Sequence, residues 1–458
     1  MKTRLFIATL LIVVAPLRAQ TSATLAPANG ASTNTVSSVS APSSATASDA
    51  ATAETSNTAV ANATLSGSLA LSDALDMARR GSFSIGSAQA RIAAAQARLQ
   101  AAGASQGTTL TLARAFGKNT GGFDEDILLS QVIEIGKRGS RVKSARLERE
   151  AATFDRAGAG TDLEFALRTA YYEAQRADVE LKLATDSLQT AQTFAQAAQN
   201  QFTAGDVPRA NVVRSSIELS RAQAAVTQAQ SDRDTSLAIV RSLLALPDGA
   251  ALQLSEKLSF KPETYDLNTL QTLALSTRSD LLAARATEKS REAAVQSAQS
   301  LNKPDAFIEA RRAAITPYRD DTGAAIPNGN SLRVGLVIPI FDFGRNRAGV
   351  SEAKAGVQEQ QAILNETTRA ARLDVATTYA RFVAAQNAIQ GFTSGRLAQS
   401  RELLDMAQVG YEHGANSYLE LLDAQTLYRT EQADYARALA AWNIARADLE
   451  RAIGGKLP

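Results

Sequence analysis

The chain lacks cysteine entirely and has one histidine, His413, among its 458 residues. Disulfides, thiolate metal sites, cysteine nucleophiles and acylated cysteines are therefore excluded, and we expect no lipid anchor on the chain. A single histidine also argues against histidine-ligated metal centres and against most catalytic triads. We accordingly expect no cofactor and no bound metal, because the sequence shows no recognisable set of metal ligands around His413.

An excess of charge of either sign is also missing: 48 Lys and Arg residues stand against 46 Asp and Glu residues, for a formal net charge of +2. This balance offers no basic surface for nucleic acid, so we expect no nucleic-acid partner. Aromatic residues make up only 5% of the chain, and the mean hydropathy of −0.14 resembles that of a soluble protein. No apolar run after residue 19 has the length of a transmembrane helix, although membrane-spanning strands carry a weaker hydropathy signal.

Enzyme motifs are missing as well. Gly136 and Lys137 do not belong to a phosphate-binding loop, because Gln131 stands where that motif needs its first glycine. Gly158 and Gly160 lack the third glycine and the preceding strand of a dinucleotide-binding turn. HExxH does not occur in the sequence. We therefore expect that the protein is not an enzyme.

The N-terminal segment is typical of an export signal followed by a linker. Lys2 and Arg4 precede the apolar run of residues 5–17, and Ala19 ends a cleavage site. We expect a signal peptide over residues 1–19, with a buried helix as the alternative. Residues 20–67 are mostly Ala, Ser and Thr with almost no charge, which predicts a disordered leader.

The two halves of the remaining chain resemble each other. Three short segments of the first half have counterparts about 200 residues further on: residues 80–83 and 278–281, 131–135 and 337–341, and 201–206 and 410–415. We expect a tandem duplication, with one structural repeat over residues 68–265 and a second over residues 266–455. Each repeat has the order helix, β-hairpin, long helix and helix.

Long helices dominate the pattern, so the predicted fold is mainly α with a small β part. Residues 140–201 and 345–411 contain no proline and are rich in good helix formers, chiefly Ala, Gln, Arg, Glu and Leu. We expect each to form one long helix, with Gly158 and Gly160 as the weak points of the first.

Apolar residues recur with period two in four segments of six to eleven residues, at residues 108–113, 127–135, 305–315 and 332–340. The tracts 117–126 and 316–331 are rich in Gly, Asn, Asp and Pro, so we expect two hairpins with polar loops. Four tilted strands of this length could cross a bilayer, but closing a barrel takes at least about eight. Either the strands form a covered sheet in a soluble protein, or several chains each contribute four strands to one barrel.

The order of elements, the duplication and several motifs resemble the TolC-type outer membrane efflux protein family over residues 69–455. The motifs that carry the resemblance are residues 411–414, 419–425 and 339–344, together with the surroundings of Phe202 and Gly205. The resemblance implies a homotrimer in which the chains share one 12-stranded outer-membrane β-barrel and a long-helix α-barrel in the periplasm. It also implies docking to a periplasmic adaptor (membrane fusion) protein and an inner-membrane pump, of the RND type if the heavy-metal branch applies.

The resemblance implies functional roles for residues at equivalent places in the two expected repeats. The helix tips that would contact the adaptor hold Phe202, Gly205, Tyr411 and Gly414, and both glycines suit a reversal with positive φ. An aromatic at a tip is more often a packing residue than a recognition residue. The strand-to-helix turns contain Gly136, Lys137, Arg138, Phe341, Asp342 and Gly344. The first three are similar to the heavy-metal efflux branch.

Glu420 and Asp423 lie three residues apart, hence on one face of a helix just past the second tip. By spacing alone they form a solvated face, whereas the resemblance implies an acidic pore constriction that favours cations. Tyr411 matches a position that links neighbouring coils in the closed state of the family. Asn416 and Asn211 stand where charged partners often lie, so we expect a more weakly latched gate.

These expectations combine into one functional hypothesis. We expect a passive outer-membrane exit duct of a tripartite efflux or type I secretion system, in a Gram-negative-type cell, with outer-membrane lipid around the strands and the helices in the periplasm. The alternative is a soluble periplasmic coiled-coil scaffold or adaptor-like protein.

Overall fold

The computed structural model describes residues 68–114, 125–314, 322 and 329–458, all within a single contact unit. The expected signal peptide and leader, residues 1–19 and 20–67, lie outside the described residues. So do the central parts of both expected hairpin loops.

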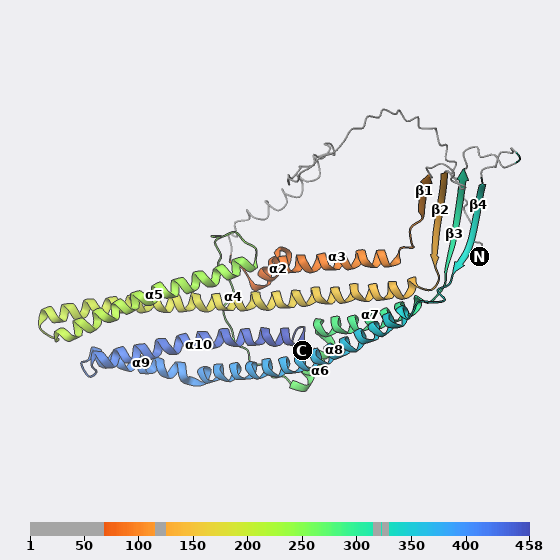
Figure 1. Ribbon diagram of the computed structural model, residues 1–458. Helices are drawn as coiled ribbons and strands as arrows, with labels where there is room; N and C mark the ends of the chain where they lie inside the picture. Colours follow the sequence, from red (N-terminus) through yellow and green to blue (C-terminus); the bar gives the residue numbers. More distant parts are fainter. Residues whose placement is uncertain (1–67, 115–124, 315–321, 323–328) are drawn as a thin grey trace, which may run out of the picture. The chain divides into compact units, whose positions relative to one another are not determined.

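The described residues are mainly helical, with a small sheet (Figure 1). The helices are α2 (Leu71–Gly81), α3 (Phe83–Gly103), α4 (Arg138–Ala204), α5 (Arg209–Leu243), α6 (Leu267–Thr277), α7 (Ser279–Ser300), α8 (Arg345–Gly391), α9 (Leu397–Glu412) and α10 (Tyr418–Ile453). The strands are β1 (Thr109–Arg114), β2 (Glu125–Glu134), β3 (Asp305–Ala314) and β4 (Gly329–Val337). Within the described ranges, no helix carries an apolar stretch long enough to cross a bilayer.

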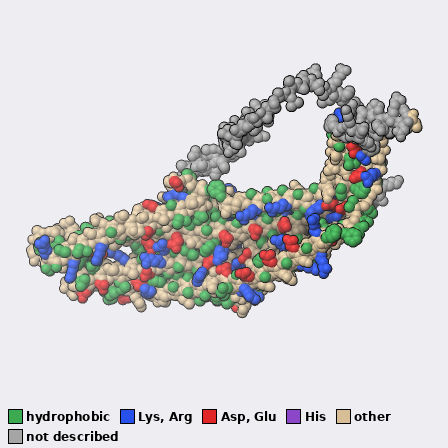
Figure 2. Space-filling view, viewed as in Figure 1, with side chains coloured by type: hydrophobic (Ala, Val, Ile, Leu, Met, Phe, Trp, Pro, Cys, Tyr) green, Lys and Arg blue, Asp and Glu red, His purple; other side chains and the backbone are tan. Residues whose placement is uncertain are grey.

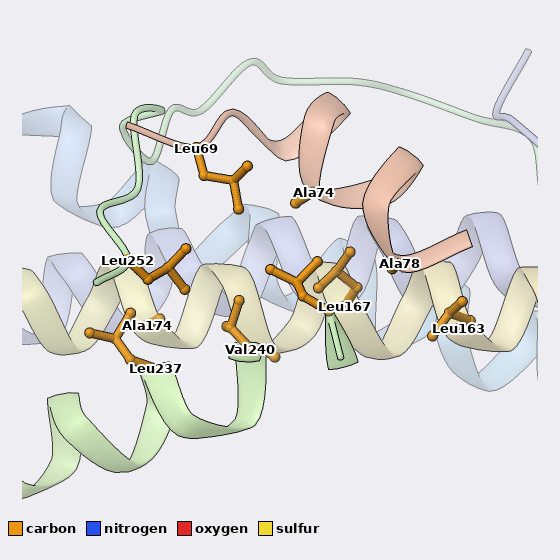
Figure 3. Packing of buried hydrophobic residues seen from close by; sticks show 11 residues of the cluster. Leu69, Ala74, Ala78, Leu163, Leu167, Ala174, Leu237, Val240 and Leu252 are labelled. Carbon is orange, nitrogen blue, oxygen red and sulfur yellow. The ribbon is translucent and has the colours of Figure 1, made fainter. Parts of the chain in front are cut away.

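Alanine and leucine build the contacts between the long helices. Leu167 of α4 belongs to one buried cluster with Leu237 and Val240 of α5 and with Ala74 of α2 (Figure 3). A buried leucine contributes about 1.5–3 kcal/mol, whereas an alanine contributes far less but lets two helices approach closely. Trp442 of α10 is buried, and its ring meets the ring of Phe260 edge-on with the centroids 5.1 Å apart.

The first long helix is continuous, as predicted, and α4 has 67 residues. Gly158 does not break it. A Cβ atom built on Gly158 would stand 2.8 Å from the hydroxyl oxygen of Ser279 at the start of α7. This glycine therefore serves the close approach of two helices.

The prediction of one uninterrupted helix over residues 345–411 is wrong. A single π-helical turn, Phe392–Arg396, separates α8 from α9, and Gly395 within it has a φ of 134°. Phe392 is buried against Tyr435 of α10, with ring centroids 5.8 Å apart. Arg396 lies 4.6 Å from the centre of the Phe392 ring and forms an ion pair of 2.7 Å with Glu431. These contacts hold a conformation that helix propensity alone does not favour.

The four described strands form one antiparallel sheet in the order β1-β2-β3-β4. All four predicted strands are confirmed, although β4 begins earlier than expected and its ladder ends at Val337 instead of residue 340. Pro339 lacks the N–H group that the ladder needs, which explains the earlier end.

The register sorts the side chains of the sheet into an apolar face and a polar face, because directly paired residues point to the same side. Large apolar side chains, all exposed in the single chain, gather on the first face: Leu110, Leu112, Ile127, Leu129, Ile133, Ile308, Leu332, Val334 and Leu336. Gln131, Arg312 and Asn330 are among the polar residues on that face.

The opposite face of the sheet carries ion pairs between neighbouring strands. Arg311 of β3 contacts Asp126 of β2 at 2.8 Å, and Arg333 of β4 contacts Glu309 of β3 at 3.3 Å. Thr109 and Ser130 lie on the same row as Glu309. The sheet therefore has one side suited to lipid and one suited to water.

Gly335 of β4 gives room to the ring of Phe307, its partner on the polar face of β3. A Cβ atom built on Gly335 would stand 2.5 Å from Cζ of Phe307. We therefore expect Gly335→Ala to displace the ring and to lower the free energy of unfolding by about 1–3 kcal/mol, the usual cost of overpacking. Paired denaturation curves in one detergent measure the difference.

Gly329→Ala is the matched control, since Gly329 begins the same strand and a Cβ atom added to it would have no heavy atom within 4 Å. It should leave stability within about 0.5 kcal/mol of the parent. Equal effects of the two substitutions would contradict the steric account.

Candidate functional site

The first helix tip joins α4 to α5 through a tight reversal. Gly205 ends α4 with a φ of 85°, and its N–H donates to the carbonyl of Phe202 at 3.0 Å. Asp206 donates to the carbonyl of Gln201 at 2.9 Å. The side chain of Phe202 is 40% exposed at the end of the helix. The predicted positive φ of Gly205 is confirmed.

The second tip joins α9 to α10 in a similar way, and Gly414 has the predicted positive φ, 73°. The ring Nδ1 of His413 lies 2.8 Å from the carbonyl oxygen of Val409 in the last turn of α9. His413 therefore takes part in closing the helix end. No group of potential metal ligands occurs among the residues that the structure describes.

Tyr411 belongs to an aromatic contact that ties the second tip to α4. Its ring centroid lies 6.3 Å from that of Tyr418, which lies 5.7 Å from that of Phe194 in α4. Tyr411 also packs against the small cluster around Leu421. Its ring therefore has a packing role, whereas Phe202 at the first tip is more open.

Glu420 has a structural role that was missed from the sequence. Its carboxylate accepts hydrogen bonds from the N–H of Ser417 at 2.7 Å and from the Ser417 hydroxyl at 3.1 Å. The Ser417 hydroxyl in turn accepts from the N–H of Glu420, so the pair forms a capping box at the start of α10. The Ser-x-x-Glu pattern of residues 417–420 could have revealed it.

Asp423 lies on the same side of α10, one turn further on. Its side chain is exposed, and neither a hydrogen bond nor an ion pair joins it to another described residue. The capping box thus orients one carboxylate of the predicted pair, while the other points freely into solvent. The chain brings Glu420 and Asp423 onto one helix face, as expected.

Asn416 packs against the last turn of α9. Its N–H donates to the carbonyl of Gly410 at 3.0 Å, and a Cβ atom built on Gly410 would stand 2.6 Å from Cγ of Asn416. Asn211 lies in the other tip, where its N–H donates to the carbonyl of Pro208 at 3.0 Å. In the described part of this one chain, no hydrogen bond joins Asn211 to Asn416 or Tyr411.

A groove of about 700 Å³ follows α4, α9 and α10 behind the second tip. Arg429 of α10 lines it and donates to the hydroxyl of Ser187 in α4 at 2.6 Å. Burial lowers the pKa of Arg429, because removing the guanidinium from water disfavours its charged form. Sequence reasoning did not select this arginine, since a single basic residue in a long helix carries no distinctive pattern.

The first strand-to-helix turn is fastened by ion pairs. Gly136 has a φ of 69°, and Lys137 after it contacts Asp305 at the start of β3 at 2.7 Å. Arg141 in the first turn of α4 makes two hydrogen bonds of 2.8 Å to Glu134 at the end of β2. Arg138 begins α4 and is exposed. These contacts fix the direction in which α4 leaves the sheet.

Asp342 organises the second turn. Its carboxylate accepts from the N–H of Gly344 at 3.0 Å and from the N–H of Asn346 at 2.8 Å. These hydrogen bonds lower the pKa of Asp342, because they stabilise the charged form. Gly344 has a φ of 87°, and Phe341 is 84% exposed.

Comparison with known proteins gives a family-level match. The model of the family described as outer membrane efflux protein matches residues 74–246 and 270–455. The chain is 25% identical over 328 residues to the cobalt-zinc-cadmium resistance protein CzcC of Cupriavidus metallidurans, covering 70% of this chain and 75% of CzcC. It is 25% identical over 426 residues to the pyoverdine export outer membrane protein OpmQ of Pseudomonas putida, covering 84% and 86% of the two chains.

Solved structures show the same fold. The outer membrane protein VceC of Vibrio cholerae has a TM-score of 0.68 at 20% identity, with 84% of this chain and 96% of VceC covered. The outer-membrane channel OprN has a TM-score of 0.70 at 20% identity, with 84% and 90% covered.

The contact between Gly410 and Asn416 generates a prediction for the second tip. Gly410→Ala should push the Asn416 side chain away from α9 and loosen the turn, because the added methyl group occupies its place. We expect amide hydrogen exchange over residues 410–417 to accelerate by about tenfold, as for a loss of about 1.4 kcal/mol in local stability.

Gly349→Ala in α8 is the control, since nothing lies within 4 Å of its added Cβ. It should leave exchange at the tip unchanged. Unaltered exchange in the Gly410 variant would show that Asn416 is not held by this contact.

Proposed function

The chain belongs to the outer membrane efflux protein family, and we propose that three copies of it form the exit duct of a tripartite efflux system. The observation that carries this proposal is the division of the sheet into an apolar face and a polar face with ion pairs. A sheet of this kind separates lipid from a water-filled pore. The family consists of channel proteins, so we propose a passive conduit without a catalytic step.

A homotrimer follows from the open edges of the sheet. Within the part of the chain that the structure describes, β1 and β4 each have a neighbouring strand on one side only, and unpaired backbone groups in lipid cost several kcal/mol each. Three copies joined edge to edge would give a closed 12-stranded barrel, with the long helices forming an α-barrel in the periplasm. We also propose that the chain arose by tandem duplication, with repeats over residues 68–265 and 266–455. The two segments matched by the family model, which fall in these two ranges, support this reading.

The exposed tips support docking to an adaptor. Phe202 and Gly205 at the first tip, with Tyr411 and Gly414 at the second, would meet a periplasmic adaptor protein that connects the duct to an inner-membrane pump. The names of similar proteins cover cobalt, zinc and cadmium resistance as well as pyoverdine export, so they do not single out one substrate class. The motif Gly136-Lys137-Arg138 favours the heavy-metal branch and an RND-type pump.

Glu420 and Asp423 are proposed as the pore constriction. In a trimer, one helix face carrying both side chains would place six carboxylates around the periplasmic entrance, which favours cations over anions. Tyr411, Asn416 and Asn211 are proposed as the links between neighbouring coils in the closed gate. Neutral amides make weaker links than charged groups, so the gate would be weakly latched.

The rival function is a soluble periplasmic scaffold. It would leave the apolar face of the sheet in water, where nine large apolar side chains are exposed. A contiguous patch of that kind marks a buried interface or a membrane surface. Planar bilayer recording separates the two functions directly, because the duct forms discrete ion-conducting channels and the scaffold forms none.

The same recordings test the constriction. Glu420→Gln together with Asp423→Asn should lower the cation-to-anion permeability ratio by up to about tenfold, since the local field falls with the charge at the entrance. Gln at position 420 can still complete the capping box, so the tip stays folded. Substitution by Ala would confuse the loss of charge with the loss of the cap.

Glu359→Gln with Glu366→Gln serves as the control, because both residues are exposed on α8 far from the tip. This variant should keep the parent's selectivity. A permeability ratio that is identical in all three proteins would remove Glu420 and Asp423 from the constriction, while the presence of channels would leave the duct itself in place.

A further inference from the structure

The apolar face of β4 continues beyond the end of the strand. Leu332, Val334 and Leu336 point to the lipid-suited side, and the same alternation brings Ile338 and Ile340 after them. Ile340 lies beyond the end of β4, and its side chain is 77% exposed. The loop between β4 and α8 therefore extends the apolar surface towards the helices.

Phe343 in this loop has a strained backbone conformation. It has a φ of 50°, which bulky residues with a Cβ atom adopt only under constraint, and its ring is fully exposed. The two hydrogen bonds that Asp342 accepts from Gly344 and Asn346 hold the backbone there. An aromatic ring held outward in this way is typical of the boundary between lipid and water.

Basic side chains are concentrated where the strands join the helices, next to this loop. The junctions between strands and helices at residues 134–141, 300–305 and 338–347 contain six basic and three acidic side chains. Glu134 and Asp305 are engaged by Arg141 and Lys137. The remaining basic side chains are those of Arg138, Lys303, Arg345 and Arg347, and no ion pair joins them to a described residue.

These junctions lie next to one another in the fold. The ammonium group of Lys303 donates to the carbonyl of Gly136 at 3.3 Å, and Asn302 contacts Asn346 in the first turn of α8. Figure 2 shows hydrophobic atoms massed at the foot of the strands with Lys and Arg side chains beside them. Neither α4 nor α8 has an acidic residue in its first turn to offset the arginines there.

We propose that this collar, formed by Arg138, Lys303, Arg345, Arg347 and the apolar loop of residues 338–343, binds anionic phospholipid headgroups of the inner leaflet around the barrel. The apolar side chains enter the acyl region, and the basic side chains reach the phosphates at its edge. The inference rests on the proposed function, because it requires the sheet to lie in a membrane. The absence of cysteine makes such a collar useful, since it fixes the depth of the barrel without a covalent lipid.

The test counts lipids bound to the purified full-length protein by native mass spectrometry. The protein in neutral detergent is titrated with phosphatidylglycerol and, separately, with phosphatidylcholine. The parent should prefer phosphatidylglycerol, and Arg345→Gln with Arg347→Gln should weaken that binding by about 25-fold, at about fivefold for each charge removed near the headgroups. Binding of phosphatidylcholine should not change.

Arg369→Gln with Arg372→Gln is the matched control, two exposed arginines about 36 Å further along the same helix. It should retain the parent's preference. Equal binding of phosphatidylglycerol by the parent and the Arg345/Arg347 variant overturns the inference, and channels that still form in bilayers then leave the proposed function standing.

Phe343→Ser adds a second readout. We expect it to keep the trimer and to weaken binding of both lipids, because it removes an apolar contact and no charge. Loss of the trimer in this variant would mean that a neighbouring copy covers the loop, and that result overturns the lipid assignment. A parent protein that forms no channels in any lipid overturns the inference and the proposed function together.

Discussion

The register of the four-stranded sheet is the constraint on which the account depends. Since side chains alternate along a strand, a shift of one residue in any pairing would exchange the two faces. The observed register aligns Leu129 of β2 with Ala310 of β3 and Leu332 of β4 on one side. It aligns Ser130, Glu309 and Arg333 on the other. The sheet has an apolar face and a polar face only because these alignments hold across all four strands.

Ion pairs join the start of α4 to the ends of two strands of the sheet. Lys137 and Arg141 bind carboxylates at the ends of β3 and β2, so the direction of α4 is set where it leaves the strands. From there, the 67 residues of α4 connect the sheet to the tip at Gly205 without a break in the helix. Alanine-rich contacts suit this task, because they allow close and regular packing over a long distance. The Phe392–Arg396 turn between α8 and α9 departs from that regularity.

Much of this could be predicted from the sequence, because period and turn chemistry are local properties. The strands, the first long helix and the positive φ of Gly205 and Gly414 followed from such patterns. The segment of residues 305–315 was the least clear strand, since Glu309 and Arg311 share a face with Phe307. Their partners, Arg333 and Asp126, lie on other strands, and no local pattern reveals such pairs. The π turn was missed for the same reason, because its support comes from Glu431 and Tyr435 of α10.

The division of the sheet into a lipid face and a pore face can be measured by thiol labelling, for which a chain without cysteine has no background. Single substitutions Ser331→Cys, Leu332→Cys, Arg333→Cys and Val334→Cys are reconstituted in vesicles and exposed to a charged, water-soluble maleimide. We predict rapid labelling at positions 331 and 333 and labelling at least about tenfold slower at positions 332 and 334, where thiols would face lipid. Similar rates at all four positions, or faster labelling at 332 and 334, would contradict it.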